Sequence, residues 1–228
     1  MHNSKLIVLS LGGSLIVPDT IDTGFLRDFK ALILEHIAQG FRFVIICGGG
    51  KTARLYQAAA RETTNLTKED IDWVGIHTTR LNAQLMRAIF DKEAYPQIIC
   101  NPYEDIQWKE PILVAAGWRP GCSTDSDAVL LAQNLQAKSL INLSNIDFVY
   151  DKDPKIHADA KKVSSISWPE FRKLLPTEWS PGLNSPFDPI ASQQAEKNGL
   201  EVVVMNGKNL ANLKKYLQGE QFEGTQIQ

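Results

Sequence analysis

Four short polar stretches each follow an apolar run that has the length and branching of a buried strand. They are residues 12–14 (GGS), 48–51 (GGGK), 119–125 (RPGCSTD) and 144–153 (SNIDFVYDKD). In an open parallel sheet the carboxyl ends of the strands lie along one edge, where ligands bind. We therefore expect the four stretches to line one binding groove.

The first two stretches are glycine turns that lead into helices. Such turns direct backbone N–H groups toward a helix start and can cradle phosphates. One glycine turn is weak evidence, because these turns are common in α/β proteins. Two of them beside two loops rich in hydroxyls and acids indicate two phosphorylated ligands that face each other, and hence phosphoryl transfer.

Lys51 follows the second glycine turn and could neutralise a phosphate. The run Gly50-Lys51-Thr52 resembles the end of a P-loop, but that motif requires an earlier glycine where Ile45 stands. A solvated lysine at a helix start is the alternative. The helix dipole disfavours a cation there, and this local conflict slightly favours a functional role.

The third and fourth stretches admit both structural and functional interpretations. The hydroxyls and acids of residues 123–127 would cap a helix N-terminus without any ligand. The Arg-Pro-Gly sequence at 119–121 is not explained by capping and favours an acceptor-phosphate site. Tyr150 could lie against a flat ring, although residues 144–153 could also be an ordinary acidic loop. Asp188 precedes Pro189 and either caps a helix or orients groups around a transferred phosphoryl.

Composition narrows the class of protein. The chain has 228 residues, 43% of them apolar and 22% charged, with a formal net charge of −2. This balance gives no electrostatic reason to expect nucleic-acid or membrane partners. Three scattered cysteines and four histidines without metal-ligand spacing argue against a disulfide framework and a structural zinc site. No signal peptide or membrane-length apolar run is recognised, so a cytoplasmic protein is expected.

Apolar periodicity predicts strands and helices that alternate along the chain, and therefore a mostly parallel sheet covered on both faces. The predicted strands are 6–11, 41–47, 98–101, 111–116, 140–143 and 202–205. The predicted helices are 25–39, 52–61, 72–90, 124–135, 168–175, 188–198 and 210–217, with Thr67 and Asp70 as a capping pair before the third.

Seven motifs in their order and spacing resemble the amino-acid kinase fold family, and within it the archaeal-type UMP kinases. The resemblance covers nearly the whole chain and is far more specific than any single motif. The motifs are GGS at 12–14, GGGKTAR at 48–54, DWVGIHTTRLNAQL at 72–85, RPGCSTDSDA at 119–128, NIDFVYDKDP at 145–154, DAKK at 159–162 and FDPIA at 187–191.

The resemblance implies an α/β fold, a three-layer α/β/α sandwich with a mostly parallel central sheet. It implies one domain over 1–228, with an acceptor-binding lobe at about 1–135 and an ATP-binding lobe at about 136–228. Kinases of this type move the γ-phosphoryl of ATP to UMP, with Mg²⁺, and give UDP. A cytoplasmic homohexamer is implied as well.

The resemblance also assigns roles by position. The ATP phosphates would contact Gly13, Ser14, Gly50 and Arg54, and the ATP nucleoside would contact Ser144, Asn145, Tyr150 and Asp153. UMP would contact Gly49, Asp72, Trp118, Arg119, Pro120, Gly121, Cys122, Ser123 and Thr124. The groups expected in catalysis are Lys51, Arg54 and Asp188, and no side chain is expected as a metal ligand.

Three positions depart from the family pattern. Ser10 and Ser180 stand where many members have lysines, and Phe148 stands where a glycine is usual. Loss of a cation at a transferring phosphoryl costs ~10²–10³ in rate, so Lys51, Arg54 or Mg²⁺ would have to substitute.

Two alternatives to a UMP kinase follow. One is a same-fold kinase for isopentenyl phosphate or carbamate, and the other is a nucleotide- or oxyanion-binding relative with little turnover, which the two serines favour. The base-reading stretch at 72–85 and the lack of a histidine near the glycine triplet favour UMP over isopentenyl phosphate.

Overall fold

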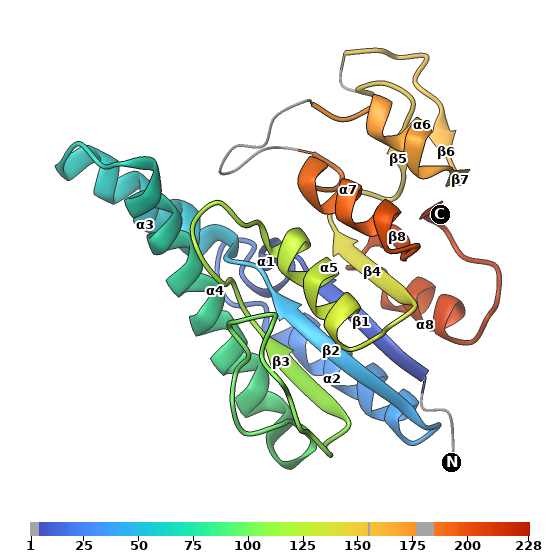
Figure 1. The fold of residues 1–228 in the computed structure, drawn as a ribbon, viewed down its shortest axis with the longest axis horizontal. Coiled ribbons are helices and arrows are strands. Elements are labelled where there is room, and N and C mark those ends of the chain that lie inside the picture. The colour runs from blue at the N-terminus through green and yellow to red at the C-terminus, as the bar shows by residue number, and fades with distance from the viewer. Residues whose placement is uncertain (1–4, 155, 177–184) are drawn as a thin grey trace.

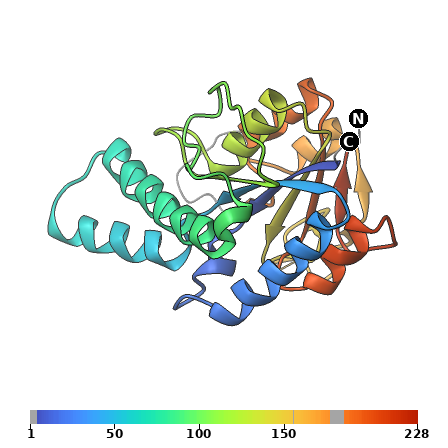
Figure 2. The ribbon, with the colours of Figure 1, turned by 90° about the horizontal axis from the view of Figure 1, so that it is seen from below.

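A seven-stranded sheet forms the centre of the molecule and is covered by helices on both faces (Figures 1 and 2). The computed structural model describes residues 5–154, 156–176 and 185–228. In order across the sheet, the strands are β3 (Ile112–Ala115), β2 (Phe41–Cys47), β1 (Lys5–Leu11), β4 (Ser139–Ser144), β8 (Glu201–Asn206), β9 (Thr225–Ile227) and β7 (Ser165–Ile166).

The five strands from β3 to β8 are parallel, as the alternating pattern predicts. Their register places Leu11 opposite Cys47 and Leu143, so β1, β2 and β4 end side by side. The strand β9 is antiparallel to β8. The glycine turns after β1 and β2 and the polar stretch after β4 therefore emerge at one edge of the sheet, which confirms the predicted fold class.

Two buried clusters of apolar residues lie on opposite faces of the sheet. Alternate residues of β2 belong to different clusters, with Phe43 and Ile45 on one face and Val44 and Ile46 on the other. This alternation is the two-residue period of a strand that is buried on both sides.

Helices from both halves of the chain cover these faces (Figure 2). One face carries α1 (Gly13–Ile16), α2 (Thr23–Ile37), α4 (Lys68–Phe90) and α8 (Leu210–Leu217). The other carries α5 (Thr124–Asn134), α6 (Trp168–Lys173) and α7 (Pro189–Lys197).

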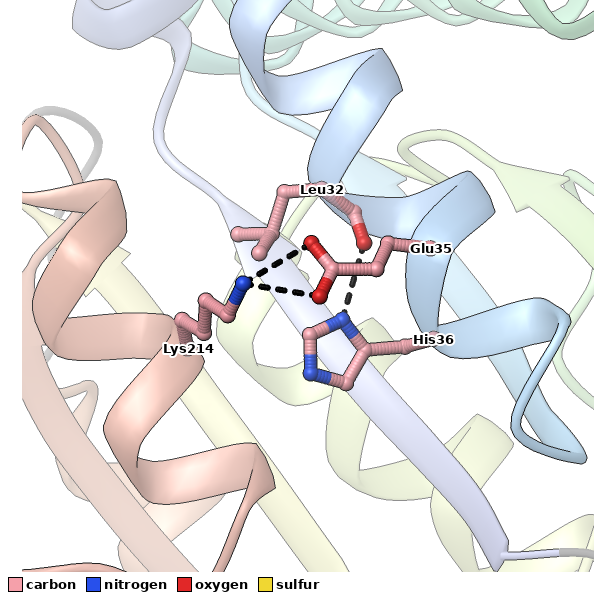
Figure 3. Close-up of polar contacts among 4 residues, drawn as sticks. All are labelled: Leu32, Glu35, His36 and Lys214. Carbon is pink, nitrogen blue, oxygen red and sulfur yellow. Dashed lines mark hydrogen bonds and ion pairs between the residues drawn. The ribbon is translucent and has the colours of Figure 1, made fainter.

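Helices α2 and α8 lie side by side, and an ion pair joins their solvent-accessible sides (Figure 3). The Lys214 ammonium lies 2.7 Å and 3.0 Å from the two carboxylate oxygens of Glu35. The next residue, His36, is fully buried, and its Nδ1 lies 2.9 Å from the Leu32 carbonyl oxygen. Because both charges remain solvent-accessible, the pair contributes little, and the buried apolar faces of the two helices hold them on the sheet.

Helices α3 (Gly50–Thr63) and α4 extend beyond the sheet (Figure 1). No residue of α3 is fully buried, and Leu55 and Tyr56 are largely exposed. The predicted capping pair is confirmed, since Thr67 and Asp70 form a reciprocal capping box. The helix begins at Lys68, directly after the predicted N-cap.

Most predicted boundaries differ from the observed ones by one or two residues, and two segments differ more substantially. Residues 98–101 were expected to form a strand, but only Ile99 pairs with β3, as an isolated bridge to Ala115. Pro96 and Pro102 flank this segment, and proline cannot donate to a ladder, which limits the pairing. The sequence also did not predict the small antiparallel pair of β5 (Val149–Tyr150) and β6 (Lys162–Val163), because two-residue strands carry too little periodicity.

Within the described residues, none of the helices combines the length and the apolar character needed to cross a bilayer.

The capping box gives a stability prediction. We expect Thr67→Ala to lower the free energy of unfolding by about 1 kcal/mol, because the N–H of Asp70 loses its acceptor. Thr63→Ala is the control, since Thr63 is an exposed helical residue whose replacement by alanine does not lower helix propensity. Urea denaturation of both variants measures the difference, and equal midpoints would contradict the assigned cap.

Candidate active site

The two glycine turns lie in backbone contact. The N–H of Gly12 donates to the Leu143 carbonyl and the N–H of Gly48 donates to the Leu11 carbonyl, each at 2.9 Å. A Cβ placed on Gly13 would lie 2.0 Å from the backbone nitrogen of Gly50. Side chains are therefore excluded from this contact, and the turns predicted to hold phosphates are brought together.

Gly50 also needs the left-handed backbone region, with φ of +65°. A Cβ there would lie 2.3 Å from the Gly13 carbonyl oxygen. Asn82, a buried residue of α4, donates its side-chain N–H to the carbonyls of Gly48 (2.7 Å) and Gly49 (3.3 Å). The turn is thus fixed from β1 on one side and from α4 on the other.

Helix α3 begins at this turn and carries the two predicted cations. Lys51 lies 3.6 Å from Asp19, and its ammonium group remains accessible because 39% of the side chain is exposed. Arg54 is exposed one turn later on the same helix. The first N–H groups of a helix lack intrahelical partners, so the start of α3 offers donors and positive charge at the same place.

Three polar side chains meet behind the glycine turns. Ser10 donates from its hydroxyl to Asp125 Oδ1 (3.2 Å), and the N–H of Asp188 donates to Asp125 Oδ2 (3.2 Å). Asp188 caps α7 by accepting the N–H of Ala191 at 2.7 Å, as the sequence suggested, and its Oδ2 is buried without a protein partner among the described residues. Ser10, which stands where many family members have a lysine, therefore contacts the carboxyl group of Asp125 through a neutral hydroxyl.

Burial governs the protonation of two acids in this region. Desolvation raises the pKa of Asp125 to about 7, and the nearby charge of Asp188 adds to the effect. Desolvation likewise raises the pKa of Asp127 to about 7, although the Trp118 N–H and the charges of Arg119 and Arg80 partly oppose it. Both carboxyl groups thus titrate near neutral pH in the folded protein.

Residues 117–123, here called the acceptor loop, run from β3 to α5. Asp72 on α4 accepts the N–H of Gly121 at 3.0 Å through Oδ2. The Arg119 guanidinium lies 3.9 Å from the centroid of the Trp118 ring, and Tyr103 packs edge-on against the same ring at 5.3 Å. Asp72 and the loop, which the resemblance joins in one acceptor site, are therefore in contact.

The predicted nucleoside contacts follow β4. Ser144 ends that strand and Asn145 comes directly after it, while Tyr150 lies on β5, opposite Lys162 of β6. Asp153 lies in the exposed segment beyond β5.

Phe148 occupies part of the same region. Its ring lies 4.9 Å from the Lys162 ammonium, so it packs beside the small two-stranded sheet. Ser180, which stands where many family members have a lysine, falls outside the described residues.

Sequence reasoning did not single out several side chains that build the site. Asn82 and Arg80 lie within the motif at 72–85, and Asp125 and Asp127 lie within the motif at 119–128. A polar residue on the buried face of a helix is a usable signal, but the capping preference of acids at a helix start concealed it in the second motif.

The family model described as the amino acid kinase family matches residues 5–206. The chain belongs to the amino acid kinase family. A protein named uridylate kinase from Thermococcus kodakarensis is 34% identical over 218 residues, which cover 94% of this chain and 96% of that protein. A uridylate kinase from Pyrococcus abyssi is 33% identical over 228 residues, with coverage of 97% and 99%.

Two solved structures also resemble this chain. The crystal structure of uridylate kinase from Archaeoglobus fulgidus has a TM-score of 0.83 at 32% identity, and the match covers 97% of this chain and 99% of that one. Aspartate kinase from Synechocystis has a TM-score of 0.74 at 16% identity over 97% of this chain and 39% of its own, which shows likeness of fold alone.

The contact between the glycine turns can be tested by substitution. We expect Gly13→Ala to lower the free energy of unfolding by about 2–3 kcal/mol and to weaken ATP binding, because the new methyl group must push the Gly50 backbone away. Gly24→Ala is the control, since a Cβ there would lie an ordinary 3.4 Å from Asp22 and alanine favours the helix. Chemical denaturation and calorimetric ATP titration measure both quantities. Equal behaviour of the two variants would refute the close approach.

Proposed function

We propose that this protein is an ATP-dependent UMP kinase. One observation carries the proposal: two glycine turns in backbone contact share a sheet edge with a loop fastened to Asp72. Such an edge accommodates two phosphorylated ligands that face each other. The full-length similarity to proteins named uridylate kinase supports UMP and ATP as those ligands.

On the donor side, the γ-phosphate of ATP would lie against the turns at Gly13, Ser14 and Gly50. The starts of α1 and α3 supply backbone donors there, and Arg54 and Lys51 supply positive charge at the mouth of the site. The nucleoside would extend along Ser144, Asn145, Tyr150 and Asp153, beyond the end of β4.

On the acceptor side, UMP would lie between Gly49, Asp72 and the residues from Trp118 to Thr124. Asp72 would accept ribose hydroxyls, and Arg119 would contact the phosphate. A phosphate oxygen of UMP then attacks the γ-phosphorus, the bond from that phosphorus to the bridging oxygen of ADP breaks, and UDP and ADP form. Catalysis of this kind depends mainly on positioning and on electrostatic stabilisation.

Mg²⁺ is proposed as the accompanying cation. The described residues contain no cluster of three or more His, Cys, Asp or Glu side chains that could hold a metal by themselves. This fits Mg²⁺, which binds largely through substrate phosphates and one or two carboxylates. Asp188, whose buried Oδ2 has no protein partner among the described residues, would be a carboxylate available to it. The ion would neutralise charge on the transferring phosphoryl.

The finer organisation is also proposed. Residues 1–228 would act as one domain, with the acceptor bound mainly by residues 1–135 and ATP by residues 136–228. A homohexamer is supported by the exposed apolar side chains of Leu55, Tyr56 and Leu81 on the protruding helices α3 and α4. Three cysteines without disulfide partners are in keeping with the cytoplasm. A place in pyrimidine nucleotide synthesis would follow from the proposed product, UDP.

The central test is product formation. Purified protein with ATP, Mg²⁺ and UMP is expected to form UDP, and parallel reactions with CMP, isopentenyl phosphate and carbamate define the acceptor. Chromatography of the nucleotides measures the product. Binding of UMP or ATP without turnover would instead support a binding relative in which Ser10 and Ser180 have replaced catalytic lysines.

The role of α3 gives a second test. We expect Arg54→Ala to lower kcat/KM for ATP by about 10–100-fold, because a charge-assisted contact to phosphate is worth about 1.5–3 kcal/mol. Arg61→Ala is the matched control, since Arg61 is exposed two turns further along the same helix. If both variants keep the kcat/KM of the parent protein, the start of α3 is not at the ATP phosphates.

A further inference from the structure

Asp127 is a buried carboxylate beneath the start of the acceptor loop. It lies in the first part of α5, and only 1% of the residue is exposed. Its Oδ2 accepts the N–H of Trp118 at 3.1 Å. Its Oδ1 is buried and has no protein hydrogen-bond partner among the described residues. Burial of an ionisable group with one oxygen unpaired costs stability, so the contact that it does make calls for an explanation.

The Trp118 contact is one part of a clamp on consecutive backbone groups. Thr79 accepts the N–H of Gly117 at 2.8 Å through its hydroxyl oxygen. Arg80 donates from Nε to the Gly117 carbonyl (3.3 Å) and from Nη2 to the Trp118 carbonyl (2.9 Å). Asp127 completes the set, so side chains from α4 and α5 hold both backbone polar groups of Gly117 and both of Trp118.

The clamp fixes the backbone directly before Arg119, whose guanidinium group stacks on the Trp118 ring. The Trp118 ring carries the Arg119 guanidinium at 3.9 Å, and the ring itself is packed against Tyr103. Arg119 is exposed and is the cation of the acceptor loop. A shift in the Trp118 backbone therefore moves the stacked pair as a unit, and small displacements of a positioning group are costly in enzymes.

We propose that Asp127 is a positioning residue, which holds the Trp118 backbone so that Arg119 faces the phosphate of the acceptor nucleotide. The inference rests on the proposed kinase function and adds to it a residue that touches neither substrate. Asp127 acts through the Trp118 N–H, and the ionised carboxylate is a stronger acceptor for that N–H than the neutral acid.

The surroundings of Asp127 make this contact dependent on pH. Arg80 on α4 and Arg119 in the loop favour the anion, while burial and the charge of Asp125 oppose it and raise the pKa of Asp127 to about 7. Cys100 and Cys122 also face the carboxylate, which contributes to the raised pKa of both thiols. As the pH rises through 7, Asp127 ionises and its hydrogen bond from the Trp118 N–H becomes stronger.

Steady-state kinetics of two variants test the proposal. We expect Asp127→Ala to raise KM for UMP at least tenfold while KM for ATP changes less than twofold. Asp127→Asn keeps an oxygen for the Trp118 N–H but cannot ionise, so we expect KM for UMP to rise less. Between pH 6 and 8, the UMP KM of wild type divided by that of Asp127→Asn should fall, because Asp127 ionises only in wild type. Titration of UMP itself affects both values equally and cancels in this ratio.

Asn212→Ala is the matched control. Asn212 is a buried polar residue of α8 that also fastens a loop, since its side chain bonds both backbone groups of Glu223. Its loss should lower stability while leaving both KM values unchanged. Equal changes in the two KM values of Asp127→Ala, or a ratio independent of pH, would overturn the proposal.

Amide hydrogen exchange provides a readout that does not require turnover. In Asp127→Asn and Asp127→Ala, peptides covering residues 117–123 should exchange at least tenfold faster than in wild type and in Asn212→Ala. Unchanged exchange would show that Asp127 does not order the loop, whatever the activity. If wild type forms no UDP but the loop exchange rises as expected, the proposed function fails while the anchoring role of Asp127 stands.

Discussion

The backbone contact between Gly13 and Gly50 is the constraint on which the site depends. Parallel pairing of β1 with β2 places the two turns next to each other, and the missing side chains let them approach. A methyl group on either glycine would overlap backbone atoms that the flanking strands hold in place. The proposed donor site would thus be made largely of backbone, with a shape that follows from strand register rather than from side-chain conformation.

The acids behind these turns repel each other, and the raised pKa of Asp125 reduces this repulsion. Asp125 and Asp188 lie together with Ser10, where a lysine would have balanced their charge. Burial and the charge of Asp188 raise the pKa of Asp125 from 3.8 to about 7, so the folded state binds a proton more tightly than the unfolded chain. Stability contributed by this group therefore falls as the pH rises from about 4 to 7 and is constant above that range. A cation brought with the nucleotide would relieve the same repulsion.

Much of the framework is predictable from the sequence because it follows from period and composition. The β2 run is apolar at every position but Arg42, and the bounds predicted for β2 and α8 agree with the structure. The capping box at Thr67 was recognisable because its two partners lie only three residues apart in sequence. The clamp on the acceptor loop was not, because Thr79, Arg80 and Asp127 meet Gly117 and Trp118 only through tertiary contacts. The family pattern marks the loop as important without indicating what holds it.

The two halves of the site are built by different means, and this difference has a consequence for specificity. The turns proposed to hold the donor consist of glycine backbone, which can bind phosphate but offers few ways to distinguish one nucleotide from another. The acceptor loop is held by side chains of α4 and α5 and displays Trp118, Arg119 and the Gly121 contact with Asp72. In the proposed assignment, discrimination between acceptors would therefore depend on α4, α5 and the loop between β3 and α5, while the glycine turns would hold the phosphates of the donor.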